Sequence, residues 1–252
     1  MCFLFYRKSF FAWIVFFLRF SLFSCLLLAA VLWTGNLLLQ DDRNISEVSE
    51  GKVNHTVVID AGHGGRDGGA SAEDGTLEKH LNLAVALKLK ALLESADIRV
   101  VMTRETDIEL ASPDSPHKKL DDLSARVKIA EAEENAILVS IHMNQFPVEK
   151  YSGLQVYYSR NHAQSLILAE TIQQGALRSF PEMPERKVKP ALDIYLMEHL
   201  QMPAVLVECG FLSNHAETER LKTDAYQKKL AMRIYVSLLD YFSEHTSCDK
   251  DV

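Results

Sequence analysis

The chain has 252 residues, enough for one large domain or two small ones, and its formal net charge is −7. The first forty residues carry three basic side chains and no acidic one, which leaves −10 on the remainder. So acidic a remainder argues against nucleic acid as a partner, and we expect none. The four cysteines include no CxxC pattern and do not imply a disulfide framework.

The N-terminal segment is apolar almost throughout residues 10–39, and residues 20–39 carry no charge. A run of that length is sufficient to span a bilayer as a helix. Basic residues precede the run and two aspartates follow it, so the positive-inside rule places the N-terminus in the cytoplasm and the remainder outside. We therefore expect residues 1–40 to be a transmembrane anchor. The alternative is a cleaved signal peptide, in which case the remainder is secreted.

The chain after this segment divides into a polar linker at 41–54, a domain at 55–245 and a polar tail at 246–252. Short apolar runs predict strands, and apolar residues repeated every three or four positions predict helices. In chain order these patterns predict a strand at 57–60, a helix at 76–95, a strand at 98–103, a helix at 120–134, strands at 136–141 and 153–159, a helix at 163–177, a strand at 203–208 and a helix at 218–242. This alternation predicts an α/β fold, a single-domain sandwich with a largely parallel central sheet and helices on both faces.

A glycine-rich stretch follows the first predicted strand, with five glycines from Gly62 to Gly69 around His63. A phosphate-binding loop would contain GxxxxGK[ST], or GxGxxG leading into a helix, and this stretch contains neither. A metal-binding loop is therefore the better interpretation. Its glycines allow a sharp turn and keep bulk away from the metal. Asp60 and Asp67 are candidates to orient His63 or its loop.

Polar residues stand at the ends of three predicted strands, where His63, His142 and Glu208 occur. Because the carboxyl ends of parallel strands meet at one edge of a sheet, we expect these side chains to converge. Two histidines and one carboxylate form a recurrent catalytic zinc site, and a second carboxylate can serve as general base. Glu78, at the start of a predicted helix, is the other carboxylate. The residues alone leave open which glutamate binds the metal.

Four segments in this order carry a resemblance to a family: IDAGHGGRDGGA, Glu78, SIHMN and PAVLVECGFLSN. Together they resemble the zinc-dependent N-acetylmuramoyl-L-alanine amidases of bacterial cell-wall metabolism, over about residues 57–242. The resemblance implies that His63, Glu78 and His142 bind Zn²⁺. It also implies that Glu208 is the catalytic glutamate. The implied reaction is hydrolysis, in peptidoglycan, of the amide between the lactyl group of muramic acid and L-alanine of the stem peptide.

Residues 188–214 resemble more narrowly the short, membrane-anchored germination-specific amidases of spore-forming bacteria. That resemblance implies a role in spore cortex maturation or germination. Only 65 residues lie between His142 and Glu208, which leaves little room for the regulatory helix of the family's cell-division members. We therefore expect regulation by a separate protein partner.

Two other functions compete with this interpretation. The first is an inactive relative that binds peptidoglycan as a regulator, although such a chain would lack a ligand or the catalytic carboxylate. The second is another zinc hydrolase of the cell wall, a carboxypeptidase or a deacetylase.

Three further residues and one loop need an interpretation. Cys209 is disfavoured as a ligand or nucleophile because its side chain should point to the opposite side of the strand from Glu208. Arg104 and Arg126 are expected to pair with acidic side chains, and contact with a substrate carboxylate is the alternative. The polar loop at 104–122 either shapes substrate choice or is solvated.

Overall fold

The computed structural model describes residues 55–245. The predicted anchor at 1–40, linker at 41–54 and tail at 246–252 lie outside these described residues, so the predicted domain boundaries and membrane span stay predictions. Among the helices of residues 55–245, none combines the length and the apolar character needed to cross a bilayer.

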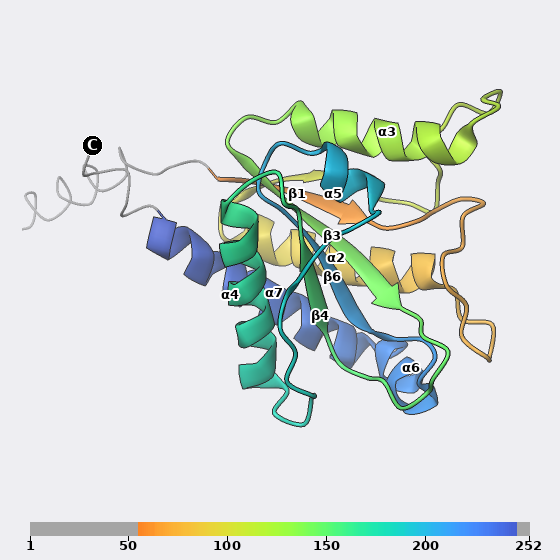
Figure 1. Cartoon of the computed structure of the whole chain (residues 1–252), viewed down its shortest axis with the longest axis vertical. Coiled ribbons are helices and arrows are strands. Elements are labelled where there is room, and N and C mark those ends of the chain that lie inside the picture. The colour runs from red at the N-terminus through yellow and green to blue at the C-terminus, as the bar shows by residue number, and fades with distance from the viewer. Residues whose placement is uncertain (1–54, 246–252) are drawn as a thin grey trace, which may run out of the picture. The chain divides into compact units, whose positions relative to one another are not determined.

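The described residues form one sheet with the strand order β2-β1-β3-β6-β4-β5 (Figure 1). The strands are β1 (Thr56–Ala61), β2 (Arg99–Met102), β3 (Ala136–Asn144), β4 (Gln155–Tyr158), β5 (Lys189–Pro190) and β6 (Ala204–Phe211). The four neighbouring strands β2, β1, β3 and β6 are parallel to one another. Strand β4 is antiparallel to β6, and β5 is parallel to β4. The predicted α/β fold with a largely parallel sheet is confirmed.

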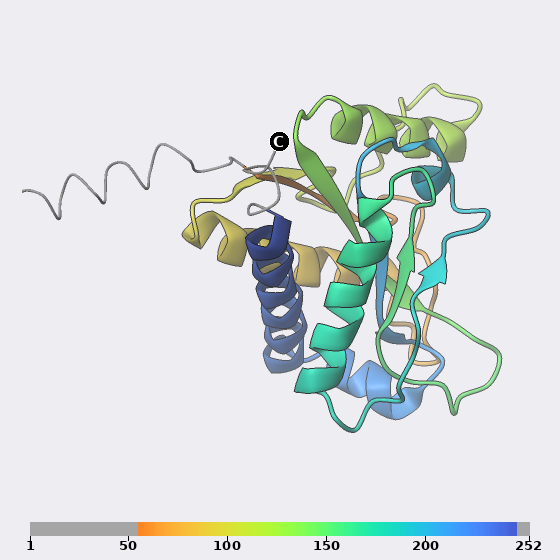
Figure 2. The ribbon, with the colours of Figure 1, turned by 60° about the vertical axis from the view of Figure 1, so that its left-hand side comes forward.

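Helices cover both faces of this sheet (Figures 1 and 2). They are α2 (Glu78–Ser95), α3 (Lys118–Glu131), α4 (Gln164–Ser179), α5 (Tyr195–His199), α6 (His215–Leu221) and α7 (Asp224–His245). Helices α2, α4 and α7 pack over one face around the larger apolar cluster. Helices α3 and α5 pack together over the other face around a smaller cluster.

The predicted helix at 218–242 is confirmed over most of its length, but its continuity is wrong, because the chain forms two helices separated by residues 222–223. The backbone N–H of Thr223 donates to the carbonyl of Arg220 at 2.9 Å, and its hydroxyl accepts from the N–H of Tyr226 at 3.3 Å. Threonine oxygens favour such capping positions over helix interiors, so α7 begins afresh at Asp224. The short elements β5 and α5 carry no clear periodicity and were not predicted.

Alternation along the strands divides the two faces. On β1, Val57 and Ile59 belong to the larger cluster, whereas Val58 belongs to the smaller one. On the face of the smaller cluster alone, the strands change from apolar to polar toward their carboxyl ends: Val58 then Asp60, Leu138 then Ser140 and His142, Leu206 then Glu208. The predicted convergence at the carboxyl edge therefore occurs on the α3 and α5 side of the sheet.

Candidate active site

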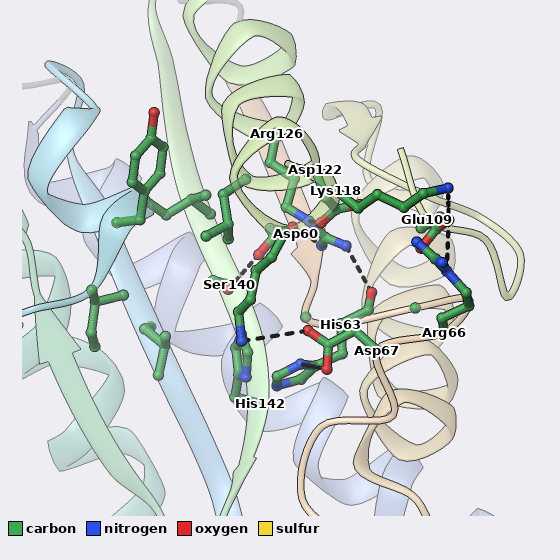
Figure 3. A pocket seen from close by; sticks show the side chains of 18 of the residues that line it. Asp60, His63, Arg66, Asp67, Glu109, Lys118, Asp122, Arg126, Ser140 and His142 are labelled. Atoms are coloured by element: carbon green, nitrogen blue, oxygen red, sulfur yellow. Dashed lines mark hydrogen bonds and ion pairs between the residues drawn. The ribbon is translucent and has the colours of Figure 1, made fainter. Parts of the chain in front are cut away.

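A cavity of about 690 Å³ lies at this carboxyl edge, between the loop after β1, helix α3 and the turn that enters α5 (Figure 3). His63, His142 and Glu208 line it. Its lining includes charged side chains, among them Arg66, Glu109 and Lys118, and apolar ones, Ile194, Leu196 and Leu206. The cavity is large enough to admit part of a substrate molecule.

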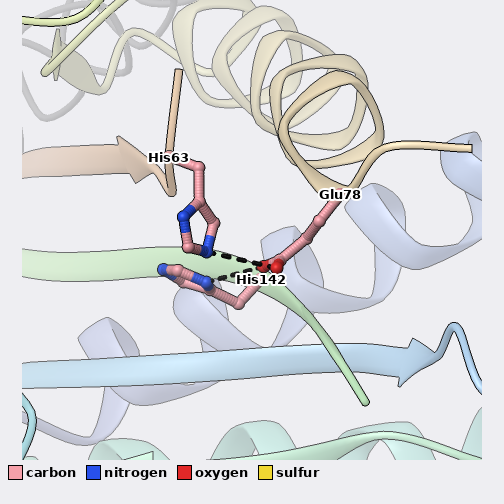
Figure 4. Close-up of side chains that lie close together, drawn as sticks. All are labelled: His63, Glu78 and His142. Carbon is pink, nitrogen blue, oxygen red and sulfur yellow. Dashed lines mark hydrogen bonds and ion pairs between the residues drawn. The ribbon is translucent and has the colours of Figure 1, made fainter. Parts of the chain in front are cut away.

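His63, Glu78 and His142 meet beside this cavity and point toward one another (Figure 4). His63 follows β1, Glu78 opens α2 and His142 belongs to β3. One ligand atom from each residue lies within 4.8 Å of the others. The two oxygens of Glu78 lie 3.1 Å from Nε2 of His63 and 2.8 Å from Nδ1 of His142. The structure therefore brings together the three residues that were predicted to bind metal, while their binding of metal stays a prediction.

Glu78 is only 3% exposed, and both of its oxygens accept hydrogen bonds. The backbone N–H of Ala70 donates to Oε2 at 2.8 Å, and the N–H of Met143 donates to Oε1 at 3.1 Å. The amide of Asn82, one helical turn along α2, also donates to Oε1 at 3.1 Å. Burial alone would raise the pKa of Glu78, but the neighbouring histidines outweigh burial and hold it far below its usual range. Glu78 is thus an ionised carboxylate fixed in one orientation, as a metal ligand must be.

His63 is held from its ring and from its backbone. Asp67 lies 3.0 Å from its Nδ1, which leaves Nε2 directed at Glu78. Its carbonyl accepts a hydrogen bond of 2.7 Å from Nη2 of Arg126, and its φ of 60° is unusual for a residue with a side chain. Burial lowers the pKa of His63, but Glu78 and Asp67 outweigh burial and raise it. Asp67 orients His63, as predicted.

Asp60 acts on the site through Arg126 and has no hydrogen bond to either histidine. Its carboxylate is 1% exposed and accepts from Arg126 at 2.7 Å, Ser140 at 2.6 Å and Thr103 at 2.8 Å. Burial raises the pKa of Asp60, but the charge of Arg126 and these hydrogen bonds bring it down to about 2. The prediction that Arg126 pairs with acidic side chains is confirmed.

Arg104 has different partners from those predicted. It is 2% exposed, and its guanidinium donates to the carbonyl oxygens of Ala61 at 2.8 Å, Gly62 at 2.9 Å and Lys79 at 2.9 Å. The prediction of an acidic hydrogen-bond partner is therefore wrong. The physical reason is that the chain leaves the sheet at Ala61 and Gly62, and buried carbonyls need donors there.

Glu208 lies directly opposite His142 in the register of β6 and β3. Its Oε2 is buried and has no hydrogen-bond partner among residues 55–245. Burial raises its pKa to about 7, with smaller opposing effects from His142, which lowers it, and Glu78, which raises it. The next residue, Cys209, is fully buried in the larger apolar cluster on the opposite face. The predicted orientation of Cys209 is confirmed, and it lies outside the cavity wall.

The sequence matches the N-acetylmuramoyl-L-alanine amidase family over residues 57–240. The chain belongs to this family.

A germination-specific N-acetylmuramoyl-L-alanine amidase of Bacillus subtilis is 39% identical over 191 residues, which covers 75% of this chain and 80% of the relative. Among solved structures, the CwlD amidase of Clostridioides difficile, solved in complex with the GerS lipoprotein, is similar with a TM-score of 0.72 and 40% identity, over 75% of this chain and 98% of that one. The amidase AmiC2 of Nostoc punctiforme is similar with a TM-score of 0.66 and 31% identity, over 75% and 98%. The family that the sequence motifs indicated is confirmed, and the chain is a peptidoglycan amidase.

The glycines of the amidase loop test whether these residues fit a metal ion. A Cβ at Gly62 would lie 2.2 Å from the imidazole of His142, and a Cβ at Gly69 would lie 2.5 Å from Oε2 of Glu78. The loop therefore cradles the three side chains so closely that only glycine fits at both positions. Two imidazoles and one carboxylate are donors that suit Zn²⁺ and leave a coordination position open. The residues fit a zinc ion.

Two parts of the amidase site were not predicted from the sequence. Asn82 fixes Glu78, and its position four residues later on the same helix face was an available signal. The apolar wall formed by Ile194 and Leu196 had no such signal. These two residues belong to a short helix and the turn that enters it, and only the fold brings them to the cavity that the histidines also line.

Proposed function

We propose that this amidase is zinc-dependent and cleaves the amide between the lactyl group of muramic acid and L-alanine of the stem peptide. The observation that supports the proposal is the convergence of His63, His142 and ionised Glu78 beside a cavity that also exposes Glu208. In the proposal His63, Glu78 and His142 hold the ion. When bound, zinc acts as a Lewis acid toward a carbonyl oxygen and lowers the pKa of water.

Glu208 is the general base in this proposal. Its Oε2 accepts the proton that the attacking water loses, and the same atom returns the proton to the leaving amine of L-alanine. Two features suit it to this role. In the described part of the chain Oε2 has no hydrogen-bond partner, and a pKa of about 7 matches a group that both accepts and donates protons at neutral pH. Glu78 is unsuited to this role because both its oxygens are occupied by backbone and histidine groups.

The products of peptidoglycan digestion test the reaction. The purified full chain is incubated with peptidoglycan and zinc, and the soluble and glycan fractions are analysed by mass spectrometry. The amidase reaction releases stem peptides with L-alanine at the N-terminus and leaves an intact lactyl carboxylate. Release of acetate would indicate a deacetylase, and stem peptides shortened at the C-terminus would indicate a carboxypeptidase. Binding without any product would indicate the regulatory alternative.

We further propose a role in spore cortex maturation or germination, supported by the name and 39% identity of the relative from Bacillus subtilis. Deletion of the gene in the source organism should leave spore formation intact while germination fails, and a copy that carries Glu208→Gln should not restore it. Normal germination of the deletion strain would contradict this role.

The amidase is proposed to act outside the cytoplasm, held by a membrane anchor at residues 1–40 or secreted if that segment is cleaved. Alkaline phosphatase fused at the C-terminus should be active, since this reporter works only outside the cytoplasm. Activity of a reporter restricted to the cytoplasm would contradict the proposal. A separate protein partner is also proposed, supported by the similar amidase that was solved with the GerS lipoprotein.

A further inference from the structure

The first part of the polar loop at 104–122 packs against the glycine-rich loop that carries His63. Oδ1 of Asp107 accepts a hydrogen bond of 2.8 Å from the backbone N–H of Gly65. The two backbones are so close that a Cβ at Gly64 would lie 2.3 Å from the carbonyl oxygen of Ile108. This part of the loop is exposed to solvent but is held against the loop that carries His63.

Lys79 completes this contact from the other side. It follows Glu78 on α2 and is only 9% exposed. Its Nζ donates to the carbonyl of Gly65 at 2.6 Å and lies 2.7 Å from Oδ2 of Asp107. The ion pair thus binds both backbone groups of one residue: Asp107 takes the N–H of Gly65 and Lys79 takes its carbonyl.

Gly65 lies at the tip of a short backbone loop that begins with His63. Gly64 and Asp67 exchange backbone hydrogen bonds of 2.9 and 3.1 Å, which close the loop, and Asp67 is also the ring partner of His63. Both His63 and Gly65 have left-handed backbone angles, with φ of 60° and 58°. Glycine adopts such an angle without strain, whereas at His63 it persists only where the surroundings hold it.

We infer that Lys79 and Asp107 are positioning residues that hold Gly65 by both backbone groups and thereby hold His63 in the orientation that faces Glu78. The inference rests on the proposed zinc site. It gives the first part of the loop at 104–122 a function, which is to support a metal ligand.

The expected effects on folding stability and on zinc affinity separate this positioning role from an ordinary structural one. Asp107 is partly exposed, with 37% of its side chain accessible, and ion pairs of that kind contribute little to folding stability. Residues that orient a metal ligand, in contrast, typically change metal affinity by about 10- to 100-fold when replaced. Loss of the pair should therefore weaken zinc binding far more than it destabilises the metal-free protein.

The experiment measures the zinc dissociation constant of the full chain by competition with a chromophoric chelator. Asp107→Ala and Lys79→Met should each weaken zinc binding roughly 10- to 100-fold. Asp107→Asn should weaken it less than Asp107→Ala, because an amide oxygen still accepts from Gly65. The matched control is Lys88→Met, which removes another ion pair of α2, at 3.2 Å to Asp224 on α7. This control should leave the dissociation constant within about twofold of the unaltered chain.

Two further measurements keep the inference testable. The melting temperature of the metal-free protein should fall no more in Asp107→Ala than in Lys88→Met. The visible absorption of the cobalt-substituted protein, which reports ligand geometry, should change in Asp107→Ala and not in Lys88→Met. Unchanged zinc affinity and cobalt spectrum in both pair variants, or a metal-free protein that unfolds, would overturn the inference. If the unaltered chain bound no zinc, the proposed function itself would fail, together with the metal-directed role of the pair.

Discussion

On the face of the sheet covered by α2, α4 and α7, β6 is apolar to its end, and Val207 and Cys209 are fully buried. On the opposite face the same strand changes from Leu206 to Glu208, whose carboxylate lines the cavity. The same difference separates the two faces of β3, where Ile141 lies in the larger cluster. Successive residues of one strand therefore alternate between the apolar core and the cavity, because neighbouring side chains of a strand point to opposite faces of the sheet.

This division indicates where stability and activity originate. The face of the larger cluster supplies most of the apolar burial, at about 25 cal/mol per Å². The other face contains a buried network of Asp60, Arg126 and Ser140, and next to it the left-handed His63. Such a network is costly to break, because removal of one partner leaves the other as a buried charge without compensation. Substitutions on the two faces should therefore have separable effects.

Removal of a predicted metal ligand should have the largest effect. His142→Ala should lose bound zinc and all measurable activity, because two protein ligands hold the ion poorly. Glu78→Gln should bind zinc weakly and regain part of its activity when metal is added. Elemental analysis alongside a peptidoglycan release assay measures both effects. Full zinc occupancy in His142→Ala would show that this histidine is not a ligand.

Replacement of Glu208 should separate catalysis from metal binding. Glu208→Gln keeps the shape of the side chain and removes the base, so turnover should fall roughly 10²-fold or more while zinc content and melting temperature stay near normal. The comparison variant is Glu78→Gln, measured in parallel. If Glu208→Gln lost its zinc and Glu78→Gln kept it, the roles of the two glutamates would be exchanged.

A smaller effect is expected for the buried acid network, and it should depend on pH. The pKa of Asp60 is about 2 in the folded chain, below its usual value of 3.8, so the unfolded chain binds more protons between these values. The carboxylate therefore contributes about 2 kcal/mol to the free energy of unfolding above about pH 4, and this contribution is lost as the pH falls toward 2.

Urea unfolding of the metal-free protein at several pH values measures this contribution. Asp60→Asn should be less stable than the unaltered chain at neutral pH, and the difference should shrink as the solution is acidified toward pH 2. A difference that is constant with pH would show that the charge of Asp60 is not what stabilises the network.

The smallest effect on activity is expected from Cys209, although it adjoins Glu208 in sequence. Cys209→Ala should reduce the free energy of unfolding by roughly 1 kcal/mol, because it removes buried apolar volume, and should leave turnover within about twofold. A large loss of turnover at unchanged stability would contradict the division between the two faces.

The sequence predicted the alternation of strands and helices because the apolar periods of long elements are strong signals. It did not predict the reversed direction of β4 and β5, since strand direction depends on how connections cross the sheet. The break at Thr223 was not predicted because the apolar period continues through it. The break depends on a capping hydrogen bond at Thr223, which the apolar period does not report. Short β5 and α5 have too few residues to show any period.

For the site, the residues at strand ends were predictable from position, because parallel strands bring their carboxyl ends together. Glu78 was a candidate from its position as well, but its role was not predictable, because an acid in the first turn of a helix is ordinarily explained by the helix dipole. Only the family resemblance assigned it to the metal. Lys79 and Asp107 had no signal, since they meet Gly65 from two segments that only the tertiary fold brings together. The prediction of acidic partners for Arg104 failed for a similar reason. A sequence does not show which buried backbone carbonyls need a hydrogen-bond donor.

The close fit of Gly62 and Gly69 also bears on how a gene of this kind can cease to encode an enzyme. A search for inactive copies among related genomes would ordinarily look for missing histidines or glutamates. In this architecture a single added methyl group at Gly62 would collide with the ring of His142, although all the histidines and glutamates of the site were unchanged. Loss of activity can thus arise by gain of atoms, and a survey of paralogues should inspect these two glycines before it counts a chain as an active enzyme.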